Sequence, residues 1–190
     1  MDTLVLKFGG TSVGSTDRIS AVAEIVKDAS KEAFPVVVVS AMSGETDRLI
    51  ELAHLFSSEP DKREFDALIS TGEKVSASLV AIALNQLGLK AKSFSAAQVG
   101  LKTTAQFSRA KILDLNKEII INTISDGYIP VITGFQGITD SGDTTTLGRG
   151  GTDITAVAIA ASIQAMRCDI YTDVNGIYTT DPRIVPEAKK

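Results

Sequence analysis

The sequence has one cysteine, one histidine and no tryptophan among its 190 residues. Because Cys168 has no second cysteine to pair with, the chain cannot form an internal disulfide, and such cysteine usage is typical of a reducing compartment. One cysteine and one histidine do not supply the ligands of a Cys/His zinc site. The Ser/His/Asp and Cys/His catalytic sets also lack support, since His54 has no partner nearby in the sequence.

Positive charge and aromatic side chains are scarce as well. Lysine and arginine number 19 against 23 aspartates and glutamates, a formal net charge of −4, and aromatic residues make up 5%. Nucleic-acid binders need a basic face or stacking platforms, so these values argue against a nucleic-acid partner. The first residues lack the pattern of a signal peptide, and the longest apolar run, 156–161, is far shorter than the roughly 20 residues that cross a bilayer. We therefore expect a cytoplasmic protein with no membrane partner.

What the sequence does contain is an alternation of strand-like and helix-like segments. We expect strands at 4–8, 36–39, 129–133 and 169–172. The valines at 36–39 are apolar on both faces, which is typical of a parallel strand covered by helices on each side. The alternation predicts an α/β fold with three layers: a doubly wound, mostly parallel sheet with helices on both faces.

The expected helices differ in character. They lie at about 19–26, 49–56, 108–125 and 152–166, with two more in 61–87 that break near Thr71-Gly72. In 49–56, Leu49, Leu52, Ala53 and Phe56 form an apolar stripe. The helix at 152–166 is apolar nearly all round, and we expect it to be buried.

Glycines follow several of the strands, at the edge where open α/β sheets bind ligands. The first such segment is Lys7-Phe8-Gly9-Gly10-Thr11-Ser12. Small residues before a helix allow backbone N–H groups to approach an anion, and a nearby lysine adds positive charge. The P-loop pattern is not met, because Ser15 stands where its lysine belongs. A tight turn with a solvated lysine is the alternative.

A second glycine-rich segment, Gly148-Arg149-Gly150-Gly151-Thr152-Asp153, opens the last expected helix. Thr152 and Asp153 could serve only as helix caps, and Arg149 could be an ordinary surface charge. Two glycine-rich segments that each carry a cation nevertheless favour binding of a polyphosphate together with a second anionic group.

Two further segments have less specific signals. In Ser70-Thr71-Gly72-Glu73-Lys74, the glutamate is either an ordinary solvated residue or a ligand for an ammonium group. Around Asn175-Gly176, a hairpin signal, the polar residues of 171–183 either form the turn or line the base and ribose of a nucleotide.

Taken together, these segments resemble the amino-acid kinase superfamily and, within it, the aspartokinases. Residues 7–13 match the opening signature of that family letter for letter, and 148–153 match its second glycine-rich segment with Thr152 where serine is more usual. The segments 70–73, 135–137 and 171–183 match in the same order. Each motif is weak by itself, whereas the ordered set is highly specific.

The resemblance implies transfer of the γ-phosphoryl group of ATP to the β-carboxylate of L-aspartate, giving 4-phospho-L-aspartate, the first step towards lysine, threonine and methionine. Mg²⁺ would be carried by the nucleotide, with no metal ligands from the protein. Lys7 would act on the transferring phosphoryl group, and Asp153 would organise the site lysine. The residues implied to bind ATP are Lys7, Gly9, Gly10, Ser12, Gly150, Gly151, Thr172, Asp173, Tyr178 and Arg183. Those implied to bind aspartate are Thr46, Glu73, Arg149 and Thr152.

The resemblance also bears on the extent of the chain. Aspartokinases usually continue with the rest of the kinase domain and paired ACT-type regulatory domains, so residues 1–190 would be a kinase domain incomplete at its C-terminus. Such a chain would be weakly active or inactive alone, and the full-length protein would form a homo-oligomer. Two alternatives remain: a superfamily member that phosphorylates glutamate, acetylglutamate or carbamate, and a non-catalytic nucleotide- or aspartate-binding module. Residues 70–73 argue against the first, and Lys7, Arg149 and Asp153 against the second.

Overall fold

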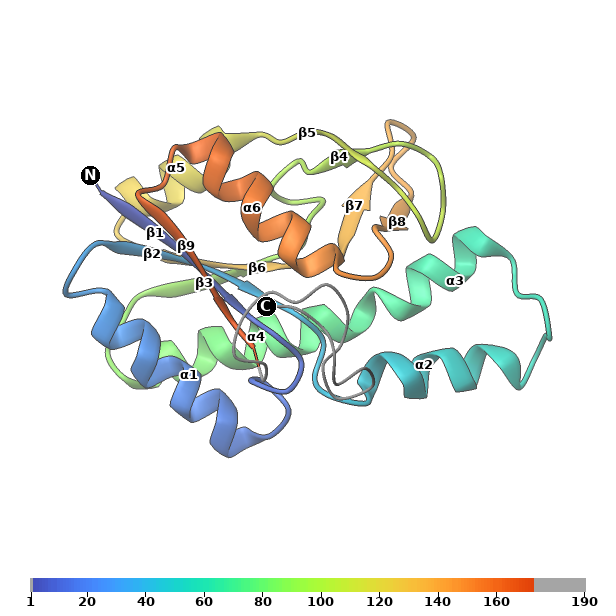
Figure 1. Cartoon of the computed structure of the whole chain (residues 1–190), viewed down its shortest axis with the longest axis horizontal. Helices are drawn as coiled ribbons and strands as arrows, with labels where there is room; N and C mark the ends of the chain where they lie inside the picture. The colour runs from blue at the N-terminus through green and yellow to red at the C-terminus, as the bar shows by residue number, and fades with distance from the viewer. Residues whose placement is uncertain (1, 173–190) are drawn as a thin grey trace, which may run out of the picture.

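The computed structural model describes residues 2–172, and its centre is a parallel sheet of five strands (Figure 1). The strand order is β3-β6-β2-β1-β9 and every neighbouring pair is parallel. The strands are β1 (Thr3–Phe8), β2 (Phe34–Val39), β3 (Ala91–Phe94), β6 (Ile129–Thr133) and β9 (Arg167–Tyr171). The four strands expected from the sequence are thus confirmed and lie side by side.

Helices cover both faces of this sheet, which confirms the three-layer, doubly wound arrangement. On one face lie α1 (Thr16–Ala29) and α4 (Thr71–Gln86), and on the other α5 (Lys117–Ser125) and α6 (Gly151–Ile163) (Figure 1). Side chains alternate between the two cores: Leu4 and Leu6 point towards α1 and α4, whereas Val5 packs with the α5 and α6 side. Burial of apolar side chains on both faces explains why β1 and β2 read as continuous apolar runs.

A small mixed sheet and a pair of helices complete the described chain. The small sheet has the order β5-β4-β7-β8 and consists of β4 (Lys102–Thr103), β5 (Ile112–Asp114), β7 (Gln136–Ile138) and β8 (Thr144–Thr146). The helices α2 (Glu45–His54) and α3 (Lys62–Ile69) pack together and project to one side of the large sheet (Figure 1). The break expected near Thr71 is confirmed, since α3 ends just before α4 begins.

Three expectations about helices were wrong. The helix expected at 108–125 begins only at Lys117, because Ser108 has a left-handed φ of 66° and β5 occupies part of the segment. In α2 only Leu49 is buried, and Phe56 lies beyond the helix with 92% of its surface exposed. The helix α6 is buried along one face only, because Ile154 and Val157 are about half exposed.

The helical stretch Lys62–Gln86, made up of α3 and α4, is long and apolar enough to cross a membrane by length and composition. Half of its most apolar window is buried within the fold. Val80 and Leu84 of α4 belong to the core between α1 and the sheet. Core helices of globular domains pass the same test, and the packing of α4 accounts for its apolar character.

Candidate active site

The sequence-predicted segments meet in one cleft of about 570 Å³ at the carboxyl ends of the central parallel strands. This is where open α/β sheets bind ligands. The cleft is lined by both glycine-rich segments, by the turn between β2 and α2, and by the first turn of α4. The predicted site residues that line it are Lys7, Gly9, Gly10, Thr46, Glu73, Arg149, Gly150, Gly151, Thr152, Asp153 and Thr172.

Lys7 and Asp153 form an ion pair in this cleft. Lys7 lies near the end of β1 and Asp153 in the first turn of α6, and 2.7 Å separates Lys7 Nζ from Asp153 Oδ1. The lysine side chain is 9% exposed and the aspartate side chain 47% exposed. The ion pair therefore holds the ammonium group of Lys7 in the cleft, beside the first turn of α6.

The glycines of the first glycine-rich segment provide space in the cleft. A Cβ atom at Gly9 would lie 3.4 Å from Lys7 Nζ, so the glycine leaves room around the ammonium group. The Gly9 N–H itself donates to Tyr171 O. A Cβ at Gly10 would lie 2.9 Å from Ala41 O, and this close approach of two backbones requires glycine.

Two helices, α1 and α6, follow the glycine-rich segments, and of these only α6 begins in the cleft lining. The helix α1 begins at Thr16, and Ser15 caps it by accepting a hydrogen bond from the Arg18 N–H. Ser12 does not line the cleft either, because the chain turns away there and its N–H donates to Gly9 O. The first glycine-rich segment therefore does not bring the start of α1 into the cleft lining, and the contact of Ser12 with phosphate stays a prediction.

The start of α6 has the features of an anion site. Its N-cap residue, Gly150, has a left-handed φ of 75°, and no side chain caps the helix. The first N–H groups of an uncapped helix carry partial positive charge and point towards an anion placed at the helix end. Arg149 also lines the cleft and adds a full positive charge. This end of the cleft is therefore suited to phosphate or carboxylate groups.

Glu73 is a buried carboxyl group in the cleft lining. It lies in the first turn of α4 with 3% of its surface exposed. Its Oε1 accepts a hydrogen bond of 3.0 Å from the Ala41 N–H, whereas its Oε2 is buried with no hydrogen-bond partner among the described residues. Burial raises the pKa of Glu73 to about 7, and the hydrogen bonds from the backbone N–H groups of Ala41 and of Glu73 itself oppose that rise. Glu73 is therefore not the ordinary solvated residue of the alternative interpretation.

Sequence reasoning missed the turn that follows β2, although the glycine at its end marked a strand-end turn. Ser40, Ala41, Met42 and Ser43 all line the cleft. The Ser40 hydroxyl donates to the Thr152 Oγ1 atom at 2.9 Å, and Ser40 O accepts from the Ser76 hydroxyl at 2.6 Å. The turn thus joins the start of α6 to α4, where Glu73 lies. Phe135, which also lines the cleft, has a left-handed φ of 66°.

Three predicted nucleotide-binding residues, Asp173, Tyr178 and Arg183, lie outside the described residues. Within 2–172, no group of three or more histidine, cysteine, aspartate or glutamate side chains is placed to hold a metal ion. The described residues thus form an α/β domain whose cleft has the features of an anion site and is also lined by a buried carboxyl group and an arginine.

The chain belongs to the amino acid kinase family, whose model matches residues 2–190. Among curated relatives, the aspartokinase of Bacillus sp. (strain MGA3) is 51% identical over 191 residues, and the match covers 100% of this chain and 46% of the relative. The chain therefore spans about half the length of the curated relatives that it matches.

Solved structures of aspartate kinases are also similar to this chain, and it again matches only part of their length. Aspartate kinase from Synechocystis is 46% identical with a TM-score of 0.79, and the match covers 98% of this chain and 31% of that one. The structure of E. coli aspartokinase III in complex with aspartate and ADP is 29% identical with a TM-score of 0.84, and the match covers 100% of this chain and 53% of that one. These matches confirm the fold class predicted from the sequence.

Proposed function

We propose that this chain is the N-terminal part of an aspartate kinase, which transfers the γ-phosphoryl group of ATP to the β-carboxylate of L-aspartate. The observation that carries the proposal is the buried Oε2 of Glu73, which has no hydrogen-bond partner among the described residues. Glu73 lines the same cleft as Arg149, Lys7 and the uncapped start of α6. The names of the relatives support it, and so does the aspartate and ADP held by the E. coli enzyme.

Glu73 and Arg149 together suit the two charges of an amino acid. A substrate ammonium group would supply the hydrogen bonds that Glu73 Oε2 lacks, and leaving such a buried acceptor unpaired costs free energy in the empty protein. The guanidinium group of Arg149 can bind an α-carboxylate through two parallel hydrogen bonds, which a lysine cannot do. Thr46, which also lines the cleft, adds a hydroxyl group for the substrate.

The remaining residues suit transfer of a phosphoryl group. A β-carboxylate is already ionised at neutral pH, so the reaction needs no general base, in agreement with the absence of histidine from the cleft lining of the described chain. Catalysis then depends on positioning and on neutralising the charge of the transferring group. Lys7 would contact that group, Asp153 would orient Lys7, and the N–H groups at the start of α6 would bind nucleotide phosphates.

Mg²⁺ fits this site only as a companion of the nucleotide, since the described residues offer no cluster of ligands of their own. When bound to the phosphates, the ion neutralises part of their negative charge. The protein residues proposed to hold the nucleotide are Lys7, Gly9, Gly10, Gly150, Gly151 and Thr172, all in the cleft lining.

We further propose that residues 1–190 are a kinase domain without its C-terminal part and without ACT-type regulatory domains. In support, the chain covers only 46% of its Bacillus relative. The complete protein would then be a cytoplasmic enzyme that forms a homo-oligomer. We refer below to the longer chain, meaning residues 1–190 joined to the natural sequence that follows them.

The test of the proposed function is release of ADP from Mg-ATP by the longer chain, measured with aspartate, glutamate, acetylglutamate and carbamate in parallel. We expect turnover with aspartate and little with the other substrates. Acetylglutamate and carbamate lack a free ammonium group for Glu73. Glutamate has both charges, but its side-chain carboxylate lies one methylene group farther from them, so it would be misplaced for the transfer. Preferential turnover of another substrate, or binding of ATP without turnover of any, would contradict the proposal.

A further inference from the structure

Asp66 of α3, whose side chain is fully buried, joins this helix to the hairpin β7–β8 through hydrogen bonds. Its Oδ2 accepts hydrogen bonds from the backbone N–H groups of Ser108 at 2.8 Å and Thr146 at 2.7 Å. Its Oδ1 accepts from the hydroxyl groups of the same residues, at 3.1 Å and 3.0 Å. One side chain thus satisfies four donors on two segments that are distant from it in the sequence.

A second buried side chain joins the same two elements beside the first. Gln136 of β7, which is 2% exposed, donates from Nε2 to Ser70 O at 2.8 Å. Ser70 follows Asp66 by one helical turn, and its N–H donates to Asp66 O. On the hairpin, Gln136 is the direct register partner of Thr146. The two attachments therefore lie next to each other at both of their ends.

Each attachment lies just before a residue of the cleft. Ser70 leads into the first turn of α4, which carries Glu73, and Thr146 leads into the loop that carries Arg149. We propose that Asp66 and Gln136 are positioning residues that fix the distance between Glu73 and Arg149. This inference rests on the proposed function. In it, the distance between Glu73 and Arg149 selects a substrate that carries both an ammonium group and an α-carboxylate.

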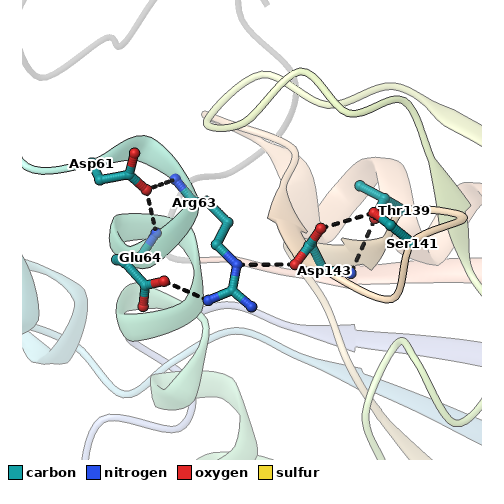
Figure 2. A network of polar contacts seen from close by, with 6 residues as sticks. All are labelled: Asp61, Arg63, Glu64, Thr139, Ser141 and Asp143. Atoms are coloured by element: carbon teal, nitrogen blue, oxygen red, sulfur yellow. Dashed lines mark hydrogen bonds and ion pairs between the residues drawn. The ribbon is translucent and has the colours of Figure 1, made fainter.

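A surface network joins α3 to the other end of the same hairpin and offers a matched comparison. In Figure 2, Arg63 contacts Asp143 in the turn between β7 and β8, and it also contacts Glu64 of its own helix. Arg63 Nε lies 2.9 Å from Asp143 Oδ1, and the two side chains are 50% and 29% exposed. Exposed ion pairs contribute little to stability, whereas buried groups left unpaired are costly.

The chemistry of Asp66 also defines a conservative variant. In Asp66→Asn, the amide oxygen can accept from both backbone N–H groups. The amide nitrogen can donate to both hydroxyl groups, because a hydroxyl can accept as well as donate. All four groups keep a partner. In Asp66→Ala, the N–H groups of Ser108 and Thr146 lose their acceptor in the protein interior.

The kinetic test uses the longer chain with Asp66→Ala, Asp66→Asn, Gln136→Met and Arg63→Ala. We expect Asp66→Ala and Gln136→Met to raise KM for aspartate about tenfold to a hundredfold, as misplacement of binding groups by about 1 Å can do. KM for ATP should change less than threefold, because the start of α6 is also held by the Ser40–Thr152 hydrogen bond. Asp66→Asn and Arg63→Ala should stay within twofold of wild type for both substrates.

A second readout does not depend on activity. Hydrogen exchange of the amides in 70–76 and 144–151 should be faster in Asp66→Ala than in Asp66→Asn or Arg63→Ala. If wild type fails to phosphorylate aspartate, the proposed function fails, and the exchange data still test whether Asp66 orders both segments. Unchanged exchange in Asp66→Ala would overturn the inference. An unchanged KM for aspartate in Gln136→Met and in folded Asp66→Ala would also overturn it, as would an equal rise in Asp66→Asn.

Discussion

Lys7 and Asp153 form an ion pair within the cleft, with 2.7 Å between Nζ and Oδ1, and they belong to segments near opposite ends of the described chain. Lys7 is on the α6 side of β1, because it alternates with Leu6 and Phe8 of the opposite core. Asp153 is in the first turn of the helix that covers this side. The ion pair therefore sets the direction of the lysine at the point where the start of α6 faces the cleft.

Replacing Lys7 by alanine in the longer chain should lower kcat by about 10²- to 10³-fold, because loss of one group that stabilises transition-state charge has an effect of that size. Affinity for ATP should fall much less. Steady-state kinetics with Mg-ATP and aspartate provide the measurement. Lys102→Ala is the control, since Lys102 forms an exposed ion pair with Asp140 away from the cleft lining. A kcat of Lys7→Ala within a few-fold of wild type would show that Lys7 has only a structural role.

Replacing Glu73 by glutamine should raise KM for aspartate about tenfold to a hundredfold. A hydrogen bond to a charged group contributes roughly 1.5–3 kcal/mol, and each 1.4 kcal/mol corresponds to about tenfold in affinity. KM for ATP should stay nearly constant, because the ammonium group belongs to aspartate alone. An equal rise for both substrates would instead indicate a general distortion of the cleft.

The same substitution should stabilise the empty protein at alkaline pH. Burial raises the pKa of Glu73 from 4.5 to about 7, so its ionisation favours the unfolded state. The contribution of protonated Glu73 to the free energy of unfolding is fully present below pH 4.5 and is lost as the pH rises through 7. The full loss is about 3 kcal/mol, at about 1.4 kcal/mol for each pH unit of the shift. Chemical denaturation of wild type and Glu73→Gln from pH 4 to pH 8 measures the effect.

Glutamine does not titrate, so the free energy of unfolding of Glu73→Gln should gain about 3 kcal/mol relative to wild type over that pH range. A difference between the two proteins that is independent of pH would contradict the assignment of a raised pKa to Glu73. The predicted gain would also show that ionised Glu73 destabilises the empty protein, as expected of a buried carboxylate that binds a cation.

Residues 1–190 alone should have little or no kinase activity. Within the described chain, β9 is an edge strand, and Ile154, Val157 and Ile170 near it are partly exposed. An open site remains in contact with water, which screens the charges meant to act on the transferring group. Specific activity of residues 1–190 and of the longer chain at saturating Mg-ATP and aspartate measures this. Comparable values would show that the catalytic unit is complete within 1–190.

The central strands could be predicted from the sequence because burial on both faces leaves a direct pattern. The runs that became β1, β2 and β6 contain almost only apolar residues, and each is followed by a turn at the same edge of the sheet. The position of the cleft followed from this arrangement. The first glycine-rich segment could be found for a different reason: two backbones approach closely at Gly10, and this approach requires glycine.

Other parts could not be predicted because their structure depends on distant partners. Residues 108–116 have helical composition, but Asp66 and Thr146 bind the backbone at Ser108 and Ala110 and hold it out of a helix. The small sheet has strands of only two or three residues, too short to show a period. The role of Ala41 was hidden too, because its contribution to the cleft is a backbone N–H.

Formation of aspartyl hydroxamate tests most directly whether the protein transfers a phosphoryl group to the β-carboxylate of aspartate. Hydroxylamine captures an acyl phosphate, so the longer chain with Mg-ATP and aspartate should produce the hydroxamate in an ATP-dependent manner. Glutamate in place of aspartate should give none above background, and Lys7→Ala should give far less with aspartate. Hydroxamate formed from glutamate but not from aspartate, or none from any substrate by a folded protein that binds ATP, would contradict this account.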